Sequence, residues 1–276
     1  MTAPEGKRAD LHLHTCHSDG TFSPQEVIRK AKELGIDAIS ITDHDTVEGL
    51  PAAFSAADGL EIIPGIELTA VFGEREIHIL GYGFRPEDPG LVKFLTKMRD
   101  YRRGRIQAMI DRLGQKGISV TFEEVLSVAG EGSLGRPHLA EVLLKGGFVR
   151  SIDEAFQRYL GDHAPCFVKG ATLTVPGAVE ILQQAGGVAV LAHPKWSIRD
   201  EWIPELISAG IQGIEVHHSD HPQGMVEKYR RIALTNHLLM TGGSDCHGFR
   251  KTKGPLLGTV TIPYDWVEQL KAKALL

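Results

Sequence analysis

Histidine and acidic residues at regular spacing are the most informative feature of this sequence. His12 and His14 lie two positions apart in the stretch Asp10-Leu11-His12-Leu13-His14. Alternate side chains of a β-strand share a face, so a strand here points both imidazoles one way and both leucines the other way. Two imidazoles placed like this can hold one metal ion, while the leucines pack against a layer of helices.

Residues of the same chemical kind follow most of the later apolar stretches. Imidazole and carboxylate ligands without thiolate favour manganese, iron or zinc over magnesium or calcium alone. Six histidines and three carboxylates are too many for one ion and suit a cluster of two or three ions. These candidate metal ligands are His12, His14, Asp19, His44, Glu67, His78, His193, Asp245 and His247.

The ligands recur because short apolar stretches alternate with amphipathic ones, which is the pattern of repeated βα units. The first helix is predicted after Ser23, with Pro24 in its first turn and Glu26 completing a capping box. Most ligands come at the carboxyl ends of the predicted strands, where βα barrels collect their catalytic residues. The strands are predicted near residues 9–15, 37–42, 60–66, 76–84, 188–192, 211–216, 238–241 and 257–262.

The pattern changes between residues 90 and 174, where helical stretches follow one another without an intervening strand. We interpret this segment as a helical insertion over the mouth of the barrel, so that the barrel domain consists of residues 8–89 and 175–276. The first helix of the insertion carries a basic face, which is either a solvated surface or an attraction for phosphate. This face comprises Arg99, Arg102, Arg103 and Arg105.

Composition narrows the class of protein. The 276 residues carry a formal charge of -5 with a pI near 6.2, so no global basic field indicates nucleic-acid binding. No apolar stretch approaches the ~20 residues that span a bilayer, and the amino terminus lacks a signal-peptide core. We therefore expect a cytoplasmic protein.

The three cysteines of the sequence, Cys16, Cys166 and Cys246, show no C-x-x-C spacing, which argues against a disulfide framework and against a thiolate zinc site.

Taken in order, these segments resemble the PHP family, named for polymerase and histidinol phosphatase. The chain reads D-L-H-L-H-T at 10–15, T-D-H-D at 42–45, G-I-E at 65–67, A-H-P at 192–194 and G-S-D-C-H-G at 243–248. The resemblance implies an α/β fold, a distorted (β/α)7 TIM-like barrel with the helical insertion over its active-site face. Within the family, the chain looks most like the branch of nucleoside 3′,5′-bisphosphate phosphatases, which also contains 5′-to-3′ exoribonucleases.

The resemblance also implies how the ligands divide among two or three divalent ions, with Mn²⁺ favoured and Fe²⁺ or Zn²⁺ as alternatives. His12, His14, Glu67 and Asp245 would hold a first ion. Glu67 would bridge to a second ion, completed by His78 and His193, and Asp19, His44 and His247 would form a third site. Histidinol-phosphate phosphatases often carry a histidine in the place of Asp19, and His17 is the competing candidate for that position.

Several residues are candidates for contacts to the substrate. Arg136 and His138 stand at a predicted helix start that contains Pro137, where an anion binds favourably, and Arg136 can grip phosphate in a bidentate way. Lys169 lies near the return to the barrel, where similar basic residues of this branch contact phosphate; an ordinary surface lysine is the alternative. His217 shares a predicted strand face with Glu215, so His217 either contacts substrate or packs in the core.

The expected function is hydrolysis of the 3′-phosphate of nucleoside 3′,5′-bisphosphates, and also of short RNA from its 5′ end. Two cations can activate a shared water for attack on phosphorus, with Asp245 and His193 at the ions and Arg136 stabilising the added negative charge. The alternatives are a histidinol-phosphate-type phosphatase, a catalytically silent PHP module that binds metal, and nonspecific nucleic-acid binding through the arginine helix. The expected partners are a nucleotide or short oligoribonucleotide, with no membrane and no obligate protein partner.

Overall fold

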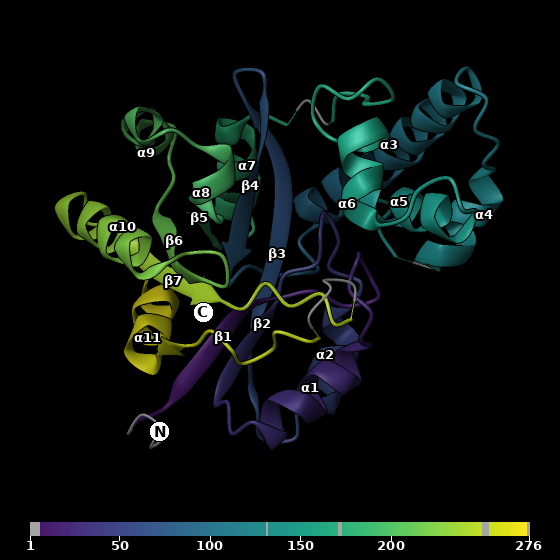
Figure 1. Cartoon of the computed structure of the whole chain (residues 1–276). Coiled ribbons are helices and arrows are strands. Elements are labelled where there is room, and N and C mark those ends of the chain that lie inside the picture. Colours follow the sequence, from purple (N-terminus) through teal and green to yellow (C-terminus); the bar gives the residue numbers. More distant parts are fainter. Residues whose placement is uncertain (1–5, 131, 171–172, 250–253, 275–276) are drawn as a thin grey trace.

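The computed structural model of the chain describes residues 6–130, 132–170, 173–249 and 254–274 (Figure 1). A sheet lies at the centre, and helices pack around its outside. Eight strands form the sheet in the order β7-β6-β5-β4-β3-β2-β1-β8. The strands are β1 (Arg8–Leu13), β2 (Ala38–Ile41), β3 (Glu61–Phe72), β4 (Arg75–Tyr82), β5 (Val188–Leu191), β6 (Gly213–His218), β7 (Leu239–Gly243) and β8 (Ile262–Pro263).

The sheet curls into a nearly closed barrel, as predicted. The backbone N–H of His14, just after β1, donates to the carbonyl of Cys246, just after β7, at 3.0 Å. Neighbouring strands are parallel with two exceptions: β4 runs antiparallel to both β3 and β5, and the short β8 runs antiparallel to β1. The reversal of β4 distorts the regular βα pattern at the point where β3 turns directly into β4 at Gly73, whose φ is +60°.

The helices fall into two groups (Figure 1). The capping box predicted for the first helix is present, with the Ser23 and Glu26 side chains each bonded to the other residue's backbone. The first group of helices lies before β3 and after η1 in the chain and consists of α1 (Pro24–Glu33), α2 (Leu50–Ala56), α7 (Val175–Gln184), α8 (Pro194–Ser197), η2 (Asp200–Trp202), α9 (Ile203–Ser208), α10 (Gln223–Thr235) and α11 (Tyr264–Lys273). Those between β4 and α7 are α3 (Pro89–Gly114), α4 (Phe122–Ala129), α5 (Arg136–Lys145), α6 (Ile152–Ala155) and the π-helical turn η1 (Phe156–Leu160).

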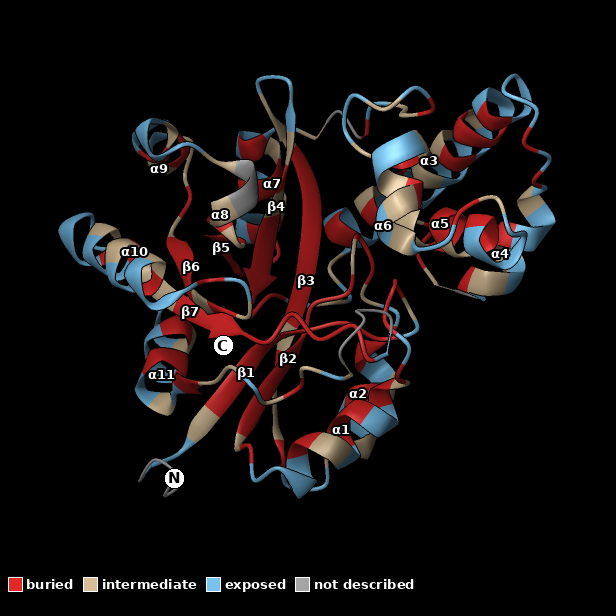
Figure 2. Cartoon of the chain, viewed as in Figure 1, coloured by how far each residue is buried: buried red, intermediate tan, exposed pale blue. Residues whose placement is uncertain are grey.

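The two groups of helices enclose separate hydrophobic cores. The barrel strands are buried along most of their length (Figure 2), and their side chains form one core with the inner faces of the surrounding helices. A second core lies between Ile106 and Cys166, within the helical segment. Helix α3 belongs to both, because Leu91 and Leu95 pack on the barrel core while Ile106 and Leu113 pack in the second. These separate cores support our proposed division into a barrel domain, 8–89 and 175–276, and a helical subdomain, 90–174.

Several strands differ in their bounds from the prediction. β3 continues to Phe72 instead of ending near residue 66, since it forms a long hairpin with β4 that pairs all the way to Arg75. β6 extends through His217 and His218. β8 is only two residues long, because Gly258 with φ +74° and a turn from Leu256 to Thr259 interrupt the apolar run before it.

In the described part of the chain, no helix is both long and apolar enough to cross a membrane.

Candidate metal centre

Glu67, which lies within the long strand β3, is at the centre of the histidine cluster. Its Oε2 lies 3.2 Å from Nε2 of His12 and 3.2 Å from Nε2 of His14. Its Oε1 lies 2.8 Å from Nδ1 of His78 and 2.8 Å from Nε2 of His193. One oxygen of this buried carboxylate therefore faces the two imidazoles of β1, and the other faces a second pair. This arrangement would allow Glu67 to hold two neighbouring metal ions.

Asp245 completes the group around the β1 histidines. Its Oδ1 lies 3.4 Å from Nε2 of His12 and 3.2 Å from Nε2 of His14. Asp245 follows β7, which lies beside β1 where the barrel closes, so the closure of the barrel brings together ligands more than 200 residues apart. Both Asp245 (φ +51°) and His193 (φ +22°) have left-handed backbone conformations, which are strained in residues other than glycine and concentrate at functional sites.

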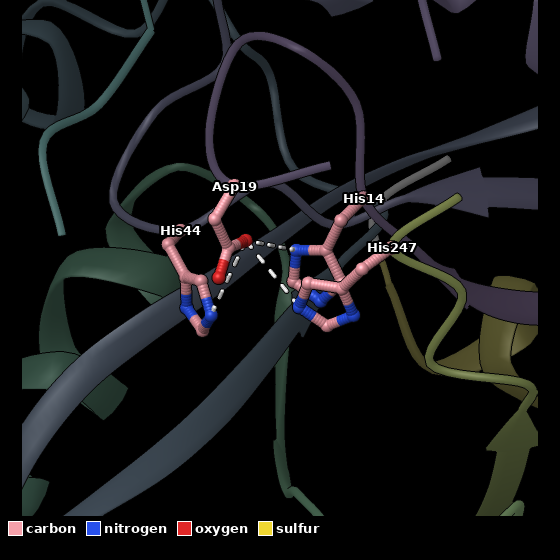
Figure 3. A group of neighbouring side chains, drawn as sticks. All are labelled: His14, Asp19, His44 and His247. Carbon is pink, nitrogen blue, oxygen red and sulfur yellow. Dashed lines mark ion pairs between the residues drawn. The ribbon is translucent and has the colours of Figure 1, made fainter. Parts of the chain in front are cut away.

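Asp19 forms a third group with three imidazoles (Figure 3). Its Oδ1 lies 3.3 Å from Nε2 of His247, 3.8 Å from Nδ1 of His14 and 3.9 Å from Nε2 of His44. The loop that carries Asp19 is held by Asp43 at the end of β2, which accepts hydrogen bonds from the backbone and the hydroxyl of Thr15. His17 lies beside Gly49 and outside this group, so of the two competing candidates the structure brings Asp19 to the cluster.

His78 reaches the cluster because β4 is reversed. His78 is the fourth residue of β4, near its amino end, whereas β1, β2, β5 and β7 present ligands at or just after their carboxyl ends. In an antiparallel strand the amino end lies at the edge where the parallel strands have their carboxyl ends. The structure thus brings all nine predicted ligands to one edge of the barrel.

The residues in the cluster fit divalent cations. Three buried ligand atoms, Nε2 of His14, Nδ1 of His44 and Oδ1 of Asp19, have no hydrogen-bond partner among the described residues. Buried polar atoms are normally satisfied, so unsatisfied atoms among these neighbouring acids and imidazoles indicate missing partners. The donors are imidazole nitrogens and carboxylate oxygens, with no thiolate in the groups. This donor set is that of manganese, iron and zinc sites.

Crowding of acids and imidazoles shifts the pKa values in the cluster. Burial alone would lower the pKa of His14, but the carboxylates of Asp245 and Glu67, each 3.2 Å from its Nε2, raise it to about 10. Burial alone would raise the pKa of Glu67, but the imidazoles around it, led by His44 and His78, lower it well below its usual value. The carboxylates thus keep their charge, while protons balance it on imidazoles such as His14. A bound cation takes over that balance and releases protons.

Glu215 of β6 contacts two members of the cluster, His12 and His193. The sequence indicated this residue only through its predicted place on one face of that strand. Its Oε1 lies 2.8 Å from Nδ1 of His12, and its Oε2 accepts the backbone N–H of His193 at 2.7 Å. Burial alone would raise the pKa of Glu215, but His12 beside it lowers that pKa, so Glu215 is charged. It fixes the ring of His12 so that Nε2 faces the carboxylates of Glu67 and Asp245.

The structure places His217 outside the cluster, although it was the predicted substrate contact. The pairing of β6 with β7 shifts register between Glu215 and His217, which breaks the alternation on which that prediction depended. The His217 ring packs on Trp266, with ring centres 5.4 Å apart. His218 lies at the cluster instead, with Nε2 3.3 Å from Oδ2 of Asp245.

A backbone hydrogen bond determines which nitrogen of the neutral His218 ring carries the proton. Its Nδ1 accepts the backbone N–H of Asp220 at 3.0 Å, so the neutral ring carries its proton on Nε2. That nitrogen is buried and has no hydrogen-bond partner among the described residues. It can donate to a bound anion, whereas metal binding through Nε2 would require loss of this proton. His218 is thus a donor beside the metal ligands, which sequence reasoning missed because two adjacent histidines do not reveal which one faces inward.

Two adjoining cavities open from the cluster. The inner cavity lies between the barrel and the helical subdomain and has a volume of about 140 Å³; its lining includes Asp19, His44, Thr69, Arg102, Arg105, Ser133, Arg136 and Phe156. The outer cavity has a volume of about 340 Å³; its lining includes Glu67, Arg75, His193, His218, Asp220, Asp245 and His247. His44, Glu76, His78 and Arg136 line both, so the two cavities are continuous over the cluster.

Three arginines of the helical subdomain point into the inner cavity, each paired with a carboxylate. Arg102 pairs with Asp45 at 2.6 Å. Arg105 and Arg136 share Glu76, at 2.9 and 3.2 Å. A bound phosphate can compete for these guanidinium groups, which are already oriented by their partners.

The remaining predicted substrate contacts lie elsewhere. His138 is buried in the first turn of α5, where its Nδ1 accepts the backbone N–H of Gly135 at 3.1 Å, so this side chain caps the helix. The Lys169 side chain is exposed and is not among the residues that line the two cavities. Arg136 alone of the predicted contacts at this helix start faces the cavities.

Comparison with known proteins identifies the family. The PHP domain matches residues 10–160, more than half of the chain. The chain belongs to the PHP family. The 5′-3′ exoribonuclease of Haemophilus influenzae is 32% identical over 248 residues, covering 87% of this chain and 90% of that protein. The 3′,5′-nucleoside bisphosphate phosphatase of Chromobacterium violaceum is 32% identical, covering 86% of each protein.

Other relatives extend the comparison. The phosphoribosyl 1,2-cyclic phosphate 1,2-diphosphodiesterase of Eggerthella lenta is 31% identical, covering 87% of this chain and 94% of that protein. A solved structure from Bifidobacterium adolescentis, described as a metal-dependent phosphoesterase, superposes with a TM-score of 0.89 at 30% identity and covers 99% of this chain and 98% of its own. This PHP protein is accordingly a metal-dependent hydrolase of phosphoester bonds with the distorted TIM-like barrel of its family.

Proposed function

We propose that this PHP enzyme hydrolyses the 3′-phosphate of nucleoside 3′,5′-bisphosphates and removes nucleotides from the 5′ end of short RNA. One observation carries the proposal: seven of the nine candidate metal ligands and three arginines line the same continuous cavity. A substrate with two phosphates can place one at the metal ligands and the other at the arginines. The names of the exoribonuclease and bisphosphate phosphatase relatives support the same substrate class.

The proposed metal content is two or three ions, with Mn²⁺ favoured and Fe²⁺ or Zn²⁺ as alternatives. Bound divalent ions would supply an activated water and neutralise charge on the phosphate. We assign His12, His14, Glu67 and Asp245 to a first ion, Glu67, His78 and His193 to a second, and Asp19, His44 and His247 to a third. The distances around both oxygens of Glu67 support the first two assignments.

The protein's own side chains orient the phosphate that reacts. Hydrolysis forms a bond from a water oxygen to phosphorus, breaks the bond from phosphorus to the 3′-oxygen, and leaves a proton on that oxygen. His218 carries its proton on Nε2 beside Asp245, so it can donate a hydrogen bond to a phosphoryl oxygen at this position. Arg136 lines both cavities and can stabilise the negative charge that develops.

The arginines of the inner cavity would select for a 5′-phosphate. Arg102, Arg105 and Arg136 approach from the helical subdomain, across the cavity from the barrel. The same bond, from phosphorus to the 3′-oxygen, breaks whether the phosphate ends there or continues into a second nucleotide. One site can therefore serve both a bisphosphate and the 5′-terminal nucleotide of RNA.

The test is phosphate release by purified, manganese-loaded protein from adenosine 3′,5′-bisphosphate, with 3′-AMP as the matched substrate that lacks the 5′-phosphate. We expect the bisphosphate to have a kcat/KM higher by about 10- to 100-fold, the range for charged hydrogen bonds. Equal rates would contradict selection by the arginines. No turnover of the bisphosphate together with good turnover of histidinol phosphate would move the assignment to that phosphatase class.

A further inference from the structure

A groove beside the outer cavity carries a cluster of aromatic and arginine side chains. It lies between the β3–β4 hairpin and η2, outside the metal ligands, and has a volume of about 710 Å³. We call it the flank groove and define it by Phe72, Arg75, Thr174, Arg199, Trp202 and Glu205. Arg75 also lines the outer cavity, so the groove continues directly from the catalytic cavity.

Trp202 contacts the other aromatic side chain and both arginines of the flank groove. Its ring centre lies 5.6 Å from that of Phe72, at an interplanar angle of 54°. The guanidinium carbons of Arg75 and Arg199 lie 5.7 and 5.4 Å from the same ring. Cation–π contact holds both guanidinium planes in place while leaving them exposed.

No carboxylate among the described residues pairs with these two arginines. Arg102, Arg105 and Arg136 in the inner cavity are each paired with a carboxylate, whereas neither Arg75 nor Arg199 forms an ion pair with a described residue. Glu74 and Glu205 also line the groove, so it has no broad positive field. The groove instead offers flat aromatic and guanidinium surfaces with two oriented positive charges. Single-stranded nucleic acid binds such surfaces by stacking its bases and by placing phosphates at the arginines.

The direction of the proposed reaction indicates which nucleotides can reach the groove. If the 5′-phosphate lies at the inner arginines and the reacting phosphate lies at the metal ligands, the inner cavity holds the first nucleotide. The second nucleotide extends from the other side of the reacting phosphate, through the outer cavity, where Arg75 lies. We propose that the flank groove binds the nucleotides that follow the first one in a short single-stranded RNA. This inference rests on the proposed function, and a nucleoside bisphosphate does not use the groove.

The test compares two substrates on the same variants. The ratio of kcat/KM for a 5′-phosphorylated triadenylate to that for adenosine 3′,5′-bisphosphate is measured for wild type, Arg199→Ala and Trp202→Ala. We expect the ratio to fall by about tenfold in each variant, within the range found for loss of one stacking partner. Arg231→Ala on α10, an exposed arginine outside the groove, is the matched control and should keep the wild-type ratio.

Each outcome separates the groove from the catalytic site. An unchanged ratio in Arg199→Ala would overturn the groove proposal, and an equal loss of kcat/KM on both substrates counts as an unchanged ratio. A wild-type protein that hydrolyses the bisphosphate but not the triadenylate would also overturn it while leaving phosphatase activity in place. If Trp202→Ala does not fold, Arg199→Ala decides, with its circular dichroism and melting temperature checked against wild type. Failure of wild type on the bisphosphate itself refutes the proposed function and is seen before any variant is made.

Discussion

The carboxylate of Glu215 holds the imidazole of His12 from behind, with Oε1 at 2.8 Å from Nδ1, and both side chains are fully buried. The other oxygen of Glu215 accepts the backbone N–H of His193. One carboxylate on β6 therefore fixes two metal ligands that come from β1 and from the end of β5. Such partners orient ligands and raise their basicity without touching the metal.

Replacement of Glu215 by glutamine should weaken metal binding. The variant keeps the shape of the side chain but removes its charge, so His12 loses the partner that makes its Nε2 a strong ligand. We expect affinity for Mn²⁺ to fall by about 10- to 100-fold, measured by competition with a chelator of known affinity. Glu268→Gln, on the exposed face of α11, should bind as wild type does. Equal affinities in Glu215→Gln and wild type would show that Glu215 has no such role.

Removal of a direct ligand should have a larger effect. Asp245 faces both β1 imidazoles through Oδ1, so Asp245→Asn removes a charged ligand at the point where the barrel closes. We expect turnover of adenosine 3′,5′-bisphosphate to fall by more than about 100-fold and the metal content per chain to decrease, measured by elemental analysis. Chelation of wild type should abolish turnover, and added Mn²⁺ should restore it. A variant with full activity would support a catalytically silent cluster and another source of hydrolysis.

Much of the candidate metal centre could be predicted because most of its ligands lie at or just after the carboxyl end of a predicted strand. The alternation in β1 fixes the common face of His12 and His14, and the apolar runs before Asp43 and Asp245 indicate strands that end at the same edge. The capping box at Ser23 likewise uses only neighbouring residues. These features depend on short-range patterns of residues, which can be read directly from the sequence.

The rest depends on long-range pairing that local periodicity does not contain. The reversal of β4 follows from a two-residue turn at Gly73, and it decides why His78 reaches the cluster. The register shift in β6 decides that His218, and not His217, lies beside Asp245. Glu76 pairs with Arg105 and Arg136 from another part of the fold. Register, strand direction and ion pairing between domains are set by tertiary packing.

Gly243, the last residue of β7, lies against the backbone of β1. A Cβ atom there would lie 2.3 Å from the backbone nitrogen of His12, a contact that only a backbone shift relieves. Gly243→Ala should therefore lower the free energy of unfolding by about 1–3 kcal/mol, measured by urea denaturation. Gly224→Ala in α10, where a Cβ meets no atom within 4 Å, is the matched control and should be neutral or stabilising by up to about 1 kcal/mol. Similar stability changes in the two variants would refute the close approach.

Arg136 should require its planar guanidinium and not merely a positive charge. The group pairs with Glu76 and Asp162 and stacks on Phe167, at 5.4 Å from the guanidinium carbon to the ring centre. A lysine keeps the charge but loses the bidentate fork, so Arg136→Lys should lower kcat/KM for the bisphosphate by about tenfold. Arg158→Lys, an exposed arginine of the same subdomain, should match wild type. If Arg136→Lys also matches wild type, the cavity uses charge alone.

Asp10 should make stability depend on pH in the acidic range. Burial raises the pKa of this carboxyl from 3.8 to about 6, although hydrogen bonds from Ser244 and Gly258 oppose the shift. Between these two pKa values the folded protein binds more protons than the unfolded chain, so the free energy of unfolding falls as pH rises from about 4 to about 6. The full effect of such a shift is roughly 3 kcal/mol.

The asparagine variant isolates that contribution, since Asp10→Asn keeps the side-chain shape and does not titrate. Urea denaturation of wild type and Asp10→Asn, both free of metal, should show wild type losing roughly 2 kcal/mol relative to the variant between pH 4 and pH 6. Above about pH 7 the difference between the two proteins should stay constant, because Asp10 is then ionised in both the folded and the unfolded state. A difference that is constant from pH 4 to pH 7 would mean that the pKa of Asp10 is the same in both states, and that the hydrogen bonds from Ser244 and Gly258 fully offset the cost of burying its charge.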